Sequence, residues 1–221
     1  METIKLLVIR LIYGRFSHTF QNFVSRSNRP NIANKRYLQP CAKLDALNHY
    51  KVAEQPLDDL AEFQTEKKIE FQNTNFGVTF RKVLRNRKRF SCYDIHQYQD
   101  VYWRRLGYRE RIFNTGMRLI YHFIDNRFFF GEMFFSDSSK VNIELVALSL
   151  LKKYTDQKSL PEKNFRIVGK NAFIFFEHTG INLSIKYIDN SDPVINETLK
   201  RIRDYSPFTK AEITSDLEDL L

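Results

Sequence analysis

The sequence predicts an α+β domain: an antiparallel sheet of about five to seven strands, one main helix packed on a face, and short flanking helices. Two observations support this prediction. Two strand-like runs, 117–124 and 128–135, are separated by Asp125-Asn126, which suits a tight hairpin. An apolar run of helix length follows at 141–151. A hairpin followed by a helix that covers one of its faces is a common way to build an α+β core.

The hairpin strands differ in their burial patterns. The first strand alternates, with Met117, Leu119, Tyr121 and Phe123 on one face and a mixed opposite face. The second strand is apolar on both faces apart from Gly131 and Glu132, which is typical of the middle of a sheet. The helix is expected over 139–154. Asp137 and Ser138 supply its capping chemistry, and two lysines lie in its last turn.

The chain divides into four segments. We predict a basic N-terminal extension over 1–44, an acidic helical segment over 45–72, an α+β domain over 73–191, and a C-terminal helix and acidic tail over 192–221. Pro56 and Pro193 suit the first turns of the two predicted flanking helices. Within the domain we expect a short helix over 76–85 and further strands over 90–95, 101–113, 165–168, 172–177 and 181–187. Gly107 is a candidate bend or bulge. The last strand is expected to expose Ser184 and Lys186 on a solvated face.

The composition fits a folded domain with a large aromatic core. The chain has 221 residues, with 20 Phe, 11 Tyr, 7 Gly and 6 Pro, which excludes fibrous and low-complexity proteins. Cys41 and Cys92 are far apart and lack the spacing of a zinc site, so we expect two reduced thiols. No metal or cofactor is predicted.

The net charge of +9 is concentrated in two blocks. Residues 1–43 hold eight Lys or Arg and one acid. Their apolar run is interrupted by charge and is too short to span a bilayer, so no transmembrane segment is expected. Three hypotheses remain for this block: an amphipathic helix over 1–20 in peripheral contact with a membrane, an organellar transit peptide, or a helix packed on the domain. We expect an intracellular, cytoplasmic protein, with peripheral membrane or organelle targeting as the alternative.

The second basic block, 81–118, is interleaved with aromatic residues. Arginine binds phosphate in a bidentate manner and aromatic rings stack on bases, so this pattern indicates a polyanion-binding surface. The candidate residues are Arg85, Arg87, Lys88, Arg89, Trp103, Arg104, Arg105, Arg109 and Arg111. The alternative is an ordinary solvated face, or one that the acids of 45–72 neutralise within the fold.

Catalytic signals are weak throughout the sequence. There is no nucleophile elbow, phosphate-binding loop or zinc-binding motif, and the five histidines are scattered. Asp94 and His96 would share a strand face and could form a dyad. Asp125, Glu132 and Asp137 are interpreted as turn, strand-edge and cap residues. We therefore expect a non-catalytic binding or interaction domain rather than an enzyme, with an unidentified partner. The alternative is single-stranded or RNA binding through 81–118.

Overall fold

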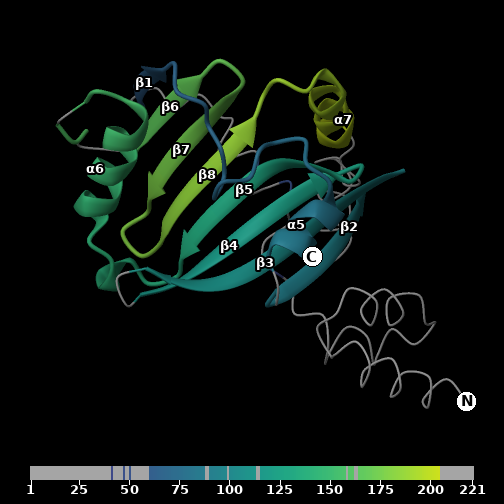
Figure 1. The fold of residues 1–221 in the computed structure, drawn as a ribbon, viewed down its shortest axis with the longest axis horizontal. Helices are drawn as coiled ribbons and strands as arrows, with labels where there is room; N and C mark the ends of the chain where they lie inside the picture. Colours follow the sequence, from purple (N-terminus) through teal and green to yellow (C-terminus); the bar gives the residue numbers. More distant parts are fainter. Residues whose placement is uncertain are drawn as a thin grey trace, which may run out of the picture.

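The eight strands in the described part of the chain form one mixed sheet, in the order β1-β6-β7-β8-β5-β4-β3-β2 (Figure 1). All neighbouring strands pair in antiparallel fashion except β1 and β6, which are parallel. The structure is a computed structural model. It describes Cys41, Leu47, Tyr50 and residues 60–204, apart from 88–89, 99, 113–114, 158 and 162–163. Most of the predicted N-terminal extension, the start of the acidic segment and the tail beyond residue 204 lie outside these residues.

The elements follow one another in a simple order along the chain. They are β1 (Ala61–Thr65), α5 (Phe80–Asn86), β2 (Cys92–Tyr98), β3 (Val101–Ile112), β4 (Thr115–Ile124), β5 (Arg127–Phe135), the 3₁₀ turn η1 (Ser138–Lys140), α6 (Ile143–Tyr154), β6 (Phe165–Gly169), β7 (Ala172–His178), β8 (Leu183–Asp189) and α7 (Pro193–Asp204). The α+β class is therefore confirmed, and the sheet has more strands than expected. No helix in the described part of the chain is both long and apolar enough to cross a membrane.

The additional strand is β1, in a segment for which we predicted a helix. That prediction is wrong for residues 61–72, because pairing with β6 overrides the local preference. Glu62 and Gln64 are exposed, whereas Phe63 packs edge-on against Phe165 at 5.9 Å between ring centroids. Thr65 is buried and donates its hydroxyl to the carbonyl of Tyr154, at the end of α6. The exposed and packed side chains of this acidic segment therefore alternate as in a strand.

The β4–β5 hairpin has the predicted tight turn. Asp125 and Asn126 have φ values of 47° and 66°, the two positive values of a type I′ turn. A β-bulge follows, because His122 pairs with Phe130 whereas Phe123 pairs with Phe128. The extra residue, Phe129, joins the core on the same side as Phe130. The bulge thus places two consecutive large rings, Phe129 and Phe130, on the same side of the sheet.

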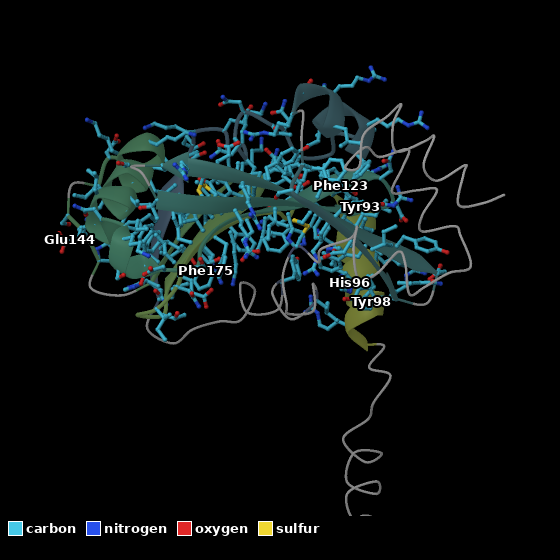
Figure 2. All side chains as sticks on the ribbon, turned by 90° about the horizontal axis from the view of Figure 1, so that it is seen from below. Tyr93, His96, Tyr98, Phe123, Glu144 and Phe175 are labelled. Carbon is cyan, nitrogen blue, oxygen red and sulfur yellow. A yellow bond between two sulfur atoms is a disulfide. The ribbon has the colours of Figure 1, made fainter. Side chains whose placement is uncertain are left out.

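The first face of the sheet is covered by α5, by α6 and by the loop between β1 and α5. Phe80 of α5 packs against Phe123 at 5.1 Å, and Leu151 of α6 is fully buried in the same cluster. Figure 2 shows Tyr93 and Phe123 on this side of the sheet, with α5 above them. Helix α6 begins at Ile143, with Asn142 as its N-cap, rather than near Asp137, which caps the preceding η1 turn.

The second face is covered at one end by α7. Ile195, Leu199 and Ile202 of this helix are buried in a cluster with Leu47, Tyr50 and the rings of β5. His96, Tyr98 and Phe175 lie on this side of the sheet, below it in Figure 2. Among the described residues, the two main hydrophobic clusters therefore lie one on each face of the sheet.

The prediction that the last strand has a solvated face is wrong. Ser184 and Lys186 are 6% and 3% exposed, because β8 lies in the middle of the sheet and both of its faces are covered. Ser184 donates to Glu132 at 3.1 Å, and Lys186 forms a 2.7 Å ion pair with Glu177. These polar side chains are buried with partners, which offsets the cost of removing them from water.

Cys41 and Cys92 form a disulfide, so the expectation of two reduced thiols is also wrong. The bond links the chain ahead of the sheet to edge strand β2. Gly107 lies opposite Cys92 on β3, and a Cβ at Gly107 would come 2.0 Å from the Cys92 sulfur. Gly107 therefore leaves room for the disulfide, which is the reason for a glycine at this position.

Candidate anion-binding site

The predicted polyanion-binding residues do not share a surface. Arg104 lies on the first face of β3, whereas Trp103, Arg105, Arg109 and Arg111 alternate onto the second face. Arg85 and Arg87 belong to the end of α5 over the first face. Lys88 and Arg89 lie outside the described residues. The block that is continuous in sequence is thus divided between two sides of the sheet, because strand residues alternate.

Trp103 is part of the core rather than a stacking platform for a base. Its side chain is 0% exposed and packs edge-on against Tyr50 and Phe129. The indole Nε1 donates a 3.0 Å hydrogen bond to Nδ1 of the buried His122. Because this ring has neither a free face nor a free N–H, Trp103 cannot bind a base without leaving the core.

Arg105 is a structural cation. It is 1% exposed, and its Nε and Nη2 donate to the two oxygens of Asp94 at 2.6 and 2.9 Å. The Cys41 backbone N–H also donates to Asp94, at 2.7 Å. Burial by itself would raise the pKa of Asp94, but the contacts with His96 and Arg105 outweigh it and lower the pKa. A paired, buried arginine such as this is not available to a ligand.

The same contacts explain why the predicted Asp94–His96 dyad is not a usable acid–base pair. Nη2 of Arg105 lies 2.7 Å from Nε2 of His96, closer than the 3.5 Å between His96 and Asp94. Both carboxylate oxygens are already bound to Arg105 as well. The cluster is therefore held as an ion pair that links β2 to β3.

Arg87 is also bound within the fold. It forms an ion pair with Glu110 on β3, and its guanidinium lies 5.8 Å and 5.7 Å from the ring centroids of Tyr108 and Tyr121. Burial raises the pKa of both tyrosines, which keeps their rings neutral next to the cation. The partner of Arg87 is thus on β3 and not in the acidic 45–72 segment.

Arg109 and Arg111 remain exposed, and the structure adds Arg118 to them. Arg109 and Arg118 are direct partners across the β3–β4 ladder, on the second face of the sheet. Together with Arg111, Met117 and Phe134 they line a cleft of about 500 Å³ near the β3–β4 turn. We call these three arginines and the cleft between them the arginine cleft.

The charge of the arginine cleft is not neutralised within the described part of the chain. Like charges directly opposite each other destabilise an antiparallel pair. Among the described residues, no carboxylate forms an ion pair with any of the three, and Glu110, which also lines the cleft, forms its ion pair with Arg87 instead. Arg118 makes one long bond, 3.4 Å to the carbonyl of Cys41. Three guanidinium groups are therefore available to an anionic partner.

Arg118 was not among the residues that the sequence predicted for this site. Its position follows from the hairpin register, since the pairing of Ile112 with Thr115 places Arg109 opposite Arg118 and Arg111 opposite Gly116. A turn in this region is recognisable from the sequence, but the exact pairing across it depends on the loop length, which local pattern does not fix.

Comparison of the chain with family models, with curated proteins and with solved structures found no match.

Proposed function

We propose that the protein is a non-catalytic binding domain that holds an anionic partner at the arginine cleft. The observation that supports this most directly is the cross-strand pair Arg109–Arg118, with Arg111 beside it and no described carboxylate bound to them. Such a pair costs stability unless an anion lies between the charges. Guanidinium groups bind phosphate and carboxylate in a bidentate manner.

The partner class that we propose is a phosphate polymer, in particular a single-stranded nucleic acid. Three adjacent arginines are suited to successive backbone phosphates, and the half-buried ring of Phe134 borders the cleft. This proposal uses fewer cations than the full basic block would supply, because Arg87 and Arg105 form ion pairs within the fold. The expected salt dependence is correspondingly modest.

The test is the binding of a labelled single-stranded oligonucleotide to the full chain at several salt concentrations. Three neutralised phosphates should give a slope of log K against log salt of about −2, at roughly 0.7 per phosphate. Arg109→Glu with Arg111→Glu should abolish this binding. A matched control is Arg81→Glu with Lys82→Glu on α5, which makes the same charge change at two exposed residues on the other face.

Two outcomes would contradict the proposal. Equal losses in the cleft variant and the α5 variant would mean that binding depends on net charge alone. Binding of polyglutamate as tight as that of the oligonucleotide, at equal charge and salt, would instead indicate an acidic protein partner. Both variant pairs replace exposed side chains, so both should keep the thermal midpoint of the parent within a few degrees.

A further inference from the structure

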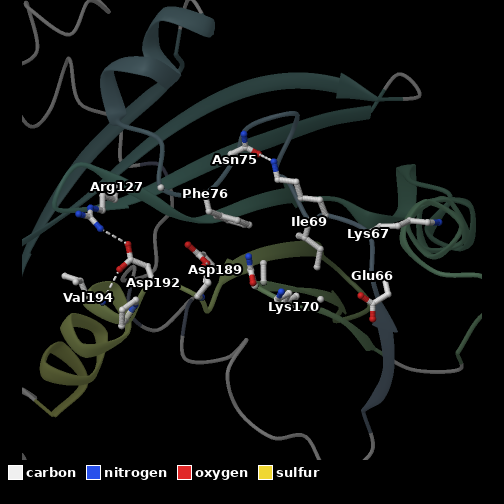
Figure 3. A pocket seen from close by; sticks show the side chains of 17 residues that line it. Glu66, Lys67, Ile69, Asn75, Phe76, Arg127, Lys170, Asp189, Asp192 and Val194 are labelled. Atoms are coloured by element: carbon white, nitrogen blue, oxygen red, sulfur yellow. Dashed lines mark hydrogen bonds and ion pairs between the residues drawn. The ribbon is translucent and has the colours of Figure 1, made fainter.

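A second cleft lies at the opposite end of the sheet from the arginine cleft. It has a volume of about 760 Å³, between the loop after β1, the β6–β7 turn and the connection from β8 to α7 (Figure 3). Arg127, at the start of β5, lines it, whereas Phe134 and Ser136, near the end of β5, line the arginine cleft. This volume is within the range of small-molecule sites. We call it the Phe76 cleft.

Phe76 supplies a flat surface in this cleft. One side of its ring stacks on Phe128, with centroids 5.2 Å apart and planes 17° from parallel. The ring is only half-buried, and Figure 3 shows it projecting into the cleft. Ile69 and Ala172, both buried, add apolar surface to the lining. A planar ring of a ligand could therefore continue the stack that Phe128 and Phe76 begin.

Asp189 supplies a buried acceptor. It is 5% exposed, and both hydrogen bonds that it receives from described residues, from the backbone N–H and the hydroxyl of Ser191, reach Oδ1. Oδ2 therefore keeps its capacity to accept from a ligand. Figure 3 places this side chain in the cleft near Phe76. A fixed carboxylate beside a stacking surface selects a ring that carries an N–H donor.

Lys170 supplies the charge that is still available to an anion. The other cations near Phe76 are occupied: Lys68 binds Asn75 and Glu70, and Arg127 binds Asp192 at 2.9 Å. Lys170 is exposed at the β6–β7 turn, and no described residue forms an ion pair with it. Lys67 also lines the cleft, but it points away from Phe76 in Figure 3.

We propose that the Phe76 cleft binds a small molecule that joins a flat, amino-bearing ring to an anionic group, as in a purine mononucleotide. The ring stacks on Phe76, its amino group donates to Asp189, and its phosphate pairs with Lys170. This site is independent of the proposed function of the arginine cleft, because the two clefts share no residue.

The experiment is a calorimetric titration of the full chain with AMP, with purine riboside 5′-monophosphate, which lacks the amino group and has no ring N–H, and with adenosine and ribose 5-phosphate as partial ligands. AMP should bind saturably. Purine riboside 5′-monophosphate should bind about tenfold more weakly, because it offers the buried Asp189 carboxylate no N–H donor. Both partial ligands should also bind at least tenfold more weakly than AMP, since adenosine lacks the phosphate and ribose 5-phosphate lacks the ring with its amino group.

Two substitutions separate the contributions. Phe76→Leu keeps apolar volume but removes the ring, and should weaken AMP and adenosine about tenfold while leaving ribose 5-phosphate unchanged. Lys170→Glu, at an exposed turn, should weaken AMP and leave adenosine unchanged. Lys152→Glu, an exposed change on α6, is the matched control and should leave every ligand unchanged.

The proposal is overturned if AMP shows no saturable binding, or if neither Phe76→Leu nor Lys170→Glu weakens it. AMP binding that is lost in the Arg109→Glu, Arg111→Glu variant and kept in Phe76→Leu would place the nucleotide in the arginine cleft instead, which also overturns it. Because Lys170 is exposed on the surface, its variant remains informative even if Phe76→Leu lowers the thermal midpoint.

Discussion

The ring of Phe71 lies over Gly131, in the space that a side chain on β5 would occupy. A Cβ at Gly131 would come 2.4 Å from Cγ of Phe71. The neighbours of Gly131 across the two ladders are Tyr121 and Tyr187, and the Phe71 ring contacts them at 4.8 Å and 5.3 Å between centroids. A glycine in a central strand thus allows an aromatic ring from the loop after β1 to close the first core.

This relationship predicts that Gly131→Ala is destabilising. The added methyl group collides with a fully buried ring, and such overpacking costs about 1–3 kcal/mol. Gly116→Ala on β4 is the control, since nothing lies within 4 Å of its Cβ position and its φ is not positive. Urea denaturation of both variants measures the difference. Equal free energies of unfolding for the two variants would mean that the Phe71 ring does not lie over Gly131.

Phe130 and Phe134 provide a comparison within one strand. Phe130 is fully buried in the second core, so Phe130→Ala should lower the free energy of unfolding by about 3–5 kcal/mol. Phe134 is only half-buried at the arginine cleft, and its truncation should cost clearly less. The measurement is chemical denaturation at neutral pH. A loss below about 1 kcal/mol for Phe130→Ala would contradict the position of the second core.

The disulfide predicts a redox-dependent stability. Cys41 and Cys92 are 51 residues apart, and closing a loop of this length stabilises a fold by about 4 kcal/mol in the chain-entropy model. Reductant should therefore lower the denaturation midpoint of the parent protein. The variant with Cys41→Ser and Cys92→Ala should start at the lower midpoint and show no response. A parent protein that is insensitive to reductant, with two titratable thiols, would mean that the bond does not form.

The ion pair between Asp94 and Arg105 predicts that the protein loses stability in acid. Its pKa is lowered in the fold, so its contribution is fully present above the unfolded pKa of about 3.9 and is lost as pH falls through the folded pKa. At pH 7, Asp94→Asn leaves the buried Arg105 without its counter-charge, at a cost of about 3–5 kcal/mol. The difference in free energy of unfolding between parent and variant should shrink from pH 7 to pH 3. A constant difference would contradict the ion pair.

Local sequence features were sufficient to predict several elements of the fold. Asp125-Asn126 predicted a tight turn, because few other residues tolerate two positive φ values in succession. Pro193 predicted the start of α7, and the apolar run before Lys152 predicted most of α6. The sequence predicted part of the candidate site, namely Arg109 and Arg111. They share a face because side chains alternate along β3.

Long-range contacts decided what the sequence left open. Trp103, Arg105 and Lys186 have polar groups and sit in strands where local pattern predicts exposure, yet each is buried with a partner from another strand. Likewise β1 is a strand only because β6, from a much later part of the chain, lies beside it. By itself the sequence determined the α+β class, the central hairpin and its turn, most of the helix that ends at Tyr154 and the helix that begins at Pro193, because turn φ values and periodicity act over a few residues. Only the tertiary structure decided the disulfide, the strand order, the pairing of the charges and the arginines that face the same cleft. The reason is that burial and ion pairing depend on neighbours that the chain brings together only when it folds.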